Sequence, residues 1–168
     1  MRVVKYVLLV GSMLLVGCGE SEDSVVAYIK ELGGQVAYDG KGADKTVVGV
    51  DLAGANIDDA GLGRVAGLAE LRKLNLAGTD VADAGLGHLE GLTKLRSLDL
   101  LGTHVTKAGV ESLKARLPKC KVLTTESQAA AVEKIKKLGG TVAYDEASPG
   151  HPVVDVLLRS EKANDATL

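Results

Sequence analysis

Residues 71–94 read LRKLNLAGTDVADAGLGHLEGLTK, and nearly the same pattern stands on either side of them. The preceding block, residues 47–70, reads VVGVDLAGANIDDAGLGRVAGLAE, and the following block, residues 95–118, reads LRSLDLLGTHVTKAGVESLKARLP. The block starts at 47, 71 and 95 give a constant period of 24 residues. Hydrophobic residues hold the first, fourth and sixth places of every block, and glycine holds the eighth. This regularity predicts a tandem array of small structural repeats.

Each block predicts one strand followed by one short helix. Leu74 and Leu76 alternate with polar or small neighbours, which is the pattern of a half-buried strand. Leu86, Leu89 and Leu92 are three residues apart and would form one stripe of a helix. One unit cannot bury both faces alone, so about three stacked units are needed. The first two helices contain paired glycines, each costing ~1 kcal/mol relative to alanine, so we expect short turns and frayed helix there.

The blocks resemble the leucine-rich repeat family, in particular bacterial repeats in which the strand is followed by G-T-x-V/I-T-D-A-G-L. Thr79 and Thr103 match the G-T pair, and Asp59 and Asp83 match the aspartate of D-A-G-L. Departures from the motif are at Ala55, Ala82 and Lys107. The likeness covers residues 47–125 and extends to the repeats of F-box leucine-rich proteins, without an F-box segment. It implies an α/β solenoid with a parallel β-sheet on the concave face and short helices on the convex face, and it names no ligand.

Composition narrows the function classes. The chain has 168 residues, which favours one domain, and it lacks Trp and Phe, so Leu, Val, Ala and Gly must form the core. The formal net charge is −2, and no basic run or aromatic stripe points to nucleic acid as a partner. His88, His104 and His151 lie in unrelated settings without the spacing of a metal site, so neither a metal nor a cofactor is predicted.

The first residues follow a different pattern from the repeats. Residues 1–17 combine a basic start with an apolar run, which is typical of a signal peptide and shorter than the ~20 residues of a spanning helix. The LVGC sequence at residues 15–18 resembles a bacterial lipobox. This resemblance implies a lipid on Cys18, an extracytoplasmic protein, and, from Gly19, a slight preference for the outer membrane. An ordinary cleaved signal peptide is the alternative.

A second repetition flanks the array. Residues 26–39, VAYIKELGGQVAYD, reappear at residues 132–145 as VEKIKKLGGTVAYD, an offset of 106. Each copy predicts a helix, a Gly-Gly stop, a strand, a turn and a second strand. Gly33 and Gly139 suit the left-handed conformation that often ends a helix.

These patterns divide the chain into segments. We expect a signal peptide at residues 1–17, an acidic tether at 18–24, an N-terminal cap at 25–46, repeats at 47–125 and a duplicated cap-like segment at 126–168. The last segment is expected to cover the open end of the array, because such ends need a cap for solubility. That open face would be formed by Leu98, Leu100, Leu113, Leu117 and Val122. A truncated second array is the alternative, and Cys120 is expected to be a buried structural thiol.

The repeats suggest a display surface rather than an active site. No nucleophile elbow, phosphate loop or spaced pair of acids points to an enzyme. The aspartates at helix starts, Asp58, Asp59 and Asp83, are expected to cap free backbone amides. The residues expected on the outward face of the sheet are Gly49, Asp51, Ala53, Lys73, Asn75, Ala77, Ser97, Asp99 and Leu101.

We therefore expect a membrane-anchored, non-enzymatic protein that binds another protein at the cell envelope. The candidate contact residues are Asp51, Lys73, Asn75, Ser97 and Asp99, with Lys73 between the two acids. Because this surface has no aromatic or arginine anchor, its contacts should be modest and polar. A structural envelope protein with no dedicated ligand is the alternative.

Overall fold

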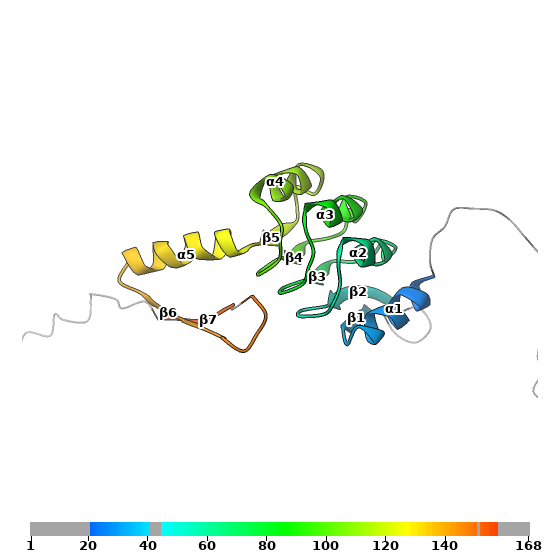
Figure 1. Ribbon diagram of the computed structural model, residues 1–168, viewed down its shortest axis with the longest axis horizontal. Coiled ribbons are helices and arrows are strands. Elements are labelled where there is room, and N and C mark those ends of the chain that lie inside the picture. Colours follow the sequence, from blue (N-terminus) through cyan, green and yellow to red (C-terminus); the bar gives the residue numbers. More distant parts are fainter. Residues whose placement is uncertain (1–20, 41–44, 151, 158–168) are drawn as a thin grey trace, which may run out of the picture.

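The computed structural model describes residues 21–40, 45–150 and 152–157 (Figure 1). Along the chain its helices and strands are α1 (Glu22–Glu31), β1 (Gln35–Asp39), β2 (Thr46–Asp51), α2 (Asp59–Val65), β3 (Lys73–Asn75), α3 (Asp83–Leu89), β4 (Ser97–Asp99), α4 (Lys107–Arg116), β5 (Lys121–Leu123), α5 (Thr125–Lys137), β6 (Thr141–Tyr144) and β7 (Val153–Leu157). Strands β1 to β5 form one sheet in sequence order. Strand β1 is antiparallel to β2, and the remaining neighbours are parallel. The expected α/β solenoid is confirmed, with α2, α3 and α4 stacked in a row beside the sheet in Figure 1.

The parallel strands stack with the register that the 24-residue period requires. Leu74 of β3 pairs with Val50 of β2 and Leu98 of β4, and Leu98 pairs with Val122 of β5. Val50, Leu74 and Leu98 are buried. Because side chains alternate across a strand, the residues before and after each of them face outward.

One hydrophobic core runs through the N-terminal cap and the three repeats. The threonines of the G-T pairs hold the turns that follow β3 and β4 by donating hydrogen bonds to carbonyl groups within them. The Thr79 hydroxyl donates a hydrogen bond to the Leu76 carbonyl (2.7 Å), and the Thr103 hydroxyl donates one to the Leu100 carbonyl (2.8 Å). Thr79 is buried, so its hydroxyl needs this partner.

The glycine-containing helices α2 and α3 are regular seven-residue helices, so the expectation of frayed helix is wrong. A close neighbour explains Gly85 of α3 and also Gly109 of α4. A methyl group at Gly85 in α3 would overlap Asp59, and one at Gly109 in α4 would overlap Asp83. At these two positions only glycine fits, because an aspartate of the preceding repeat takes up the space.

These two aspartates join successive repeats instead of capping their own helices. The Ala82 N–H donates to Asp59 Oδ1 (2.8 Å). The Thr106 N–H donates to Asp83 Oδ1 (2.7 Å), and the Thr106 hydroxyl donates to Asp83 Oδ2 (2.6 Å). Only Asp58 of the three caps its own helix, by accepting from the Gly61 N–H (2.9 Å). The capping prediction is thus confirmed for Asp58 and wrong for the other two.

The N-terminal cap contains the predicted order of elements. Val25 and Ile29 of α1 are fully buried against the first repeat, and Gly33 ends the helix with φ of 77°. The helix starts earlier than the predicted boundary at residue 25, because the Ser21 hydroxyl caps it and acidic residues fill its first turn. The expected tether therefore overlaps the start of α1.

The C-terminal segment repeats the same order of elements, as predicted. Helix α5 is followed by Gly139 with φ of 76° and by the β6–β7 hairpin, which forms a separate two-stranded sheet. Residues 158–168 lie outside the described part of the chain. None of the described helices is both long enough and apolar enough to cross a membrane.

The predicted position of this segment over the open end of the array is wrong. Helix α5 leads away from α4 (Figure 1), and the turn between β6 and β7 comes back to the loops of the repeats. A methyl group built on Gly54 or Gly78 would lie against Pro149, and one on Gly102 would meet Gly150. In the whole chain, Leu98, Leu100, Leu113 and Leu117 of the expected open face are buried and Val122 is half-buried.

Candidate functional site

The outward side of the parallel strands carries two rows of residues, which we call the strand ladder. One row runs from Gly49 through Lys73 and Ser97, and the other from Asp51 through Asn75 and Asp99. A hollow of ≈380 Å³ lies over the ladder, bordered on one side by β1. All five predicted contact residues line this hollow, so the fold brings them together on one surface.

The order of the charged residues differs from the prediction. Asn75, rather than Lys73, stands directly between Asp51 and Asp99. Lys73 is paired with Gly49 and Ser97 in the neighbouring row, and its side chain is exposed. The difference arises because strand register depends on the repeat period, which aligns residues 24 apart.

The row of Asp51, Asn75 and Asp99 also stabilises the turns that follow the strands. The backbone N–H groups of Ala53, Ala77 and Leu101 each donate a hydrogen bond of 3.0 Å to the side chain two residues earlier, that is Asp51, Asn75 and Asp99. These bonds turn the chain at the end of each strand. One oxygen of each side chain is occupied by the turn, which leaves the other carboxylate oxygens, or the amide group, for contacts with another molecule.

Asp99 is the electrostatically unusual member of the ladder. Burial raises the pKa of its carboxyl group above the ordinary value, the Leu101 N–H acts in the opposite direction, and the negative charge of Asp51 raises the pKa further. The two acids lie on either side of Asn75. This part of the ladder therefore favours a partner that offers hydrogen-bond donors or a positive charge.

The apolar end of the ladder is covered by the chain itself. Leu101 was expected to face outward, yet only 1% of it is exposed, and Ala77 is also buried. The turn at Pro149 and Gly150 lies against Leu101 and Gly78. The sequence offers one sign of this contact, which is leucine at position 101 where the first two repeats have alanine.

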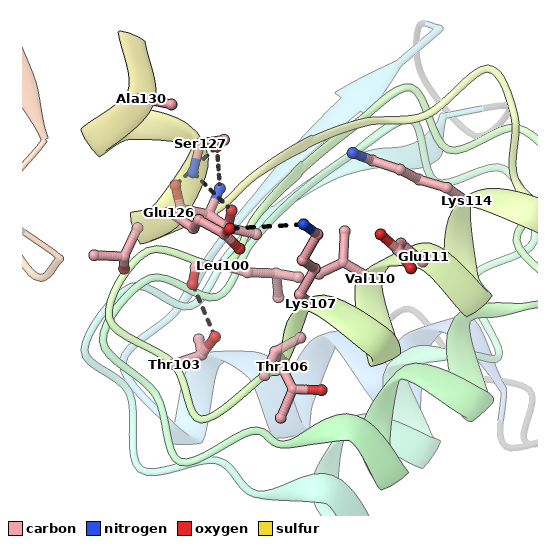
Figure 2. A pocket seen from close by; sticks show the side chains of 13 residues that line it. Leu100, Thr103, Thr106, Lys107, Val110, Glu111, Lys114, Glu126, Ser127 and Ala130 are labelled. Carbon is pink, nitrogen blue, oxygen red and sulfur yellow. Dashed lines mark hydrogen bonds and ion pairs between the residues drawn. The ribbon is translucent and has the colours of Figure 1, made fainter. Parts of the chain in front are cut away.

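A second hollow, which sequence reasoning missed, lies between α4 and the start of α5 (Figure 2). Its volume is ≈460 Å³, and Leu100 and Val110 provide apolar lining. Lys107, at the place of the inter-repeat aspartates, points toward Glu126, with 4.0 Å between Nζ and Oε1. The series of hydrogen bonds made by an aspartate to the next repeat ends here, because Lys107 replaces the aspartate.

Histidine and cysteine form no recognisable reactive centre in the described residues. His88 and His104 are exposed, and His104 lies 3.6 Å from the Asp80 carboxylate. No group of three or more His, Cys, Asp or Glu side chains is arranged there to hold a metal ion. Cys120 is a buried free thiol, as expected, and burial raises its pKa. His151 and the predicted lipidation site Cys18 lie outside the described residues.

Comparison with known proteins supports the repeat assignment. A leucine-rich repeat family model matches residues 91–114, which cover β4, the turn after it and most of α4. A search of curated proteins found no match to the chain. Leucine-rich repeats are generally non-enzymatic scaffolds for protein–protein interaction, and the match suggests protein binding for this chain.

Proposed function

We propose that this chain is a lipid-anchored scaffold that binds another protein through the strand ladder. The supporting observation is that five polar residues from three parallel strands line one hollow. The residue between them on each strand points into the core. The ladder lacks aromatic and arginine side chains, so the contact is polar and of modest affinity. The partner is a protein segment that presents donors to Asp51 and Asp99 and an acceptor to Lys73.

The anchor is the second part of this proposal. A lipid on Cys18 would hold the scaffold at the extracytoplasmic surface of a membrane, and the support for it is the LVGC sequence after the apolar run. Two or more acyl chains give stable attachment, because each buried methylene contributes about 0.8 kcal/mol. The outer membrane is favoured over the inner membrane by Gly19.

Charge changes on the ladder provide the test. The variant Lys73→Glu with Ser97→Glu alters two exposed side chains and leaves Asp99 in place, because Asp99 holds the Leu101 N–H. Its matched control, Lys119→Glu with Ser112→Glu, makes the same changes at exposed positions outside the ladder. Both proteins would be crosslinked in native membranes and the attached proteins identified.

We expect the ladder variant to lose a discrete crosslinked partner that the control retains. Unchanged capture by both variants would contradict the proposal. Crosslinking of only generic envelope material by the unaltered chain would favour a structural envelope protein, an alternative supported by the absence of anchor residues on the ladder.

A further inference from the structure

The duplicated C-terminal segment exposes a face that its N-terminal copy buries. The offset of 106 residues matches Val50 to Val156 and Leu32 to Leu138. Val50 is 4% exposed and Leu32 is packed partly buried on the core, whereas Val156 is 41% exposed and Leu138 is 66% exposed. In the N-terminal copy these positions are packed into the core of the array, whereas in the C-terminal copy they are exposed.

Two large apolar side chains of this copy protrude at the same end of it. Leu138 directly follows α5, and Leu157 at the end of β7 pairs with Thr141 at the start of β6. Leu157 is 63% exposed. The opposite end of the hairpin is the turn at Pro149 that contacts the repeats, so the two leucines lie at the end away from the array (Figure 1).

Positive charge gathers beside these leucines. The last turn of α5 carries Lys134, Lys136 and Lys137, all exposed. The corresponding residues of the N-terminal copy are Tyr28, Lys30 and Glu31, so the C-terminal copy has two additional lysines here. Each copy has one acid in this stretch, because Glu133 stands where the N-terminal copy has Ala27. Acidic residues of the hairpin turn, Asp145 and Glu146, lie at the opposite end. We call the two leucines and three lysines the basic apolar tip.

We propose that the basic apolar tip docks into the headgroup layer of an anionic lipid bilayer. Exposed leucines at the end of a helix and a hairpin can enter the interface without spanning it, and lysines beside them are attracted to anionic headgroups. Neither the strand ladder nor the lipid on Cys18 is required for this contact. The contact would fix the orientation of the array on the membrane surface.

The absence of tryptophan from the chain allows a direct test. Leu138→Trp places a single fluorophore in the tip, and Leu123→Trp places one at another exposed leucine, on β5 of the array. The full chain would be reconstituted with vesicles of phosphatidylcholine, with or without phosphatidylglycerol, that contain brominated acyl chains as quenchers. Both proteins share any tether at the N-terminus, so the difference between them reports contact of the tip alone.

We expect the tryptophan emission of Leu138→Trp to be blue-shifted and quenched on anionic vesicles. On neutral vesicles the quenching should be at least twofold smaller. Changing Lys134, Lys136 and Lys137 together to Gln should remove the difference between the two lipid compositions.

Quenching of Leu138→Trp no greater than that of Leu123→Trp would overturn the proposal. A blue shift without vesicles that grows with protein concentration would also overturn it, because the tip would then bind a second copy of the chain. Loss of tip insertion would leave capture of a partner by the ladder unchanged, so the two proposals can fail separately.

Discussion

The hydrogen bonds between successive repeats predict that Gly109→Ala destabilises the chain while Asp83 is present and stabilises it when Asp83 is removed. Gly109 is in the first turn of α4, and an alanine within a helix is normally more stable than glycine by about 1 kcal/mol. In this protein the added methyl group would overlap the Asp83 carboxylate, which accepts two hydrogen bonds from Thr106. The methyl group can be accommodated only if the carboxylate moves away.

The magnitude follows from these contacts. Each of the two hydrogen bonds contributes about 1 kcal/mol, so moving Asp83 costs about 2 kcal/mol and Gly109→Ala should destabilise the chain by about 1 kcal/mol net. In an Asp83→Ala background the carboxylate is gone, and the same substitution should stabilise by up to about 1 kcal/mol. The coupling between the two positions is therefore about 2 kcal/mol.

The assay is urea unfolding of the four proteins of this double-mutant cycle. Gly87→Ala in α3 is the matched control, because a methyl group there has no neighbour within 4 Å, and it should stabilise the chain in both backgrounds. The reasoning is refuted if Gly109→Ala stabilises the chain while Asp83 is present, or if the coupling is indistinguishable from zero.

Three further predictions concern the anchor, the ladder and the hairpin. Cys18→Ala should abolish fatty-acid labelling and reduce membrane association to the reversible contact of the basic apolar tip, and unchanged labelling would remove the anchor from the account. Asp99→Asn should raise the free energy of unfolding at pH 7, since burial disfavours the charged carboxyl and an amide oxygen can still accept from the backbone, as Asn75 shows. Because the folded-state pKa is raised, this gain should vanish as the pH falls below the ordinary carboxyl pKa, and a gain that persists there would contradict the assigned cause. Pro149→Asp should free the hairpin turn from the repeats and speed its cleavage by a protease while the array stays folded, and an unchanged cleavage rate would show that the contact over Leu101 is unimportant.

The sheet could be predicted from the sequence because its determinants are local and periodic. Leu74 and Leu76 alternate within one strand, and the 24-residue spacing places each strand against the equivalent residues of the next. The positions of Asp51, Asn75 and Asp99 in one outward row follow from the same spacing. Lys73 belongs to the neighbouring row, because the same spacing aligns it with Gly49 and Ser97.

The remaining features depend on contacts that no local pattern encodes. An aspartate at a helix start has the same sequence signature whether it caps its own helix, as Asp58 does, or the next repeat, as Asp59 and Asp83 do. Leu101 is buried by a turn far along the chain, and the replacement of alanine by leucine at this position does not show which segment covers it. The direction of α5 is likewise a property of tertiary packing, whereas its length and its capping residues are local.

The measurement that tests the central claim most directly is site-specific photo-crosslinking from the strand ladder in living cells. A photoreactive amino acid would replace Ser97 on the ladder or Ser112 on the exposed side of α4, two exposed serines on different faces. The account predicts a discrete adduct with one protein from position 97 and none of the same mass from position 112. Equal adducts from both positions, or none from position 97, would contradict the claim that the ladder is the binding surface.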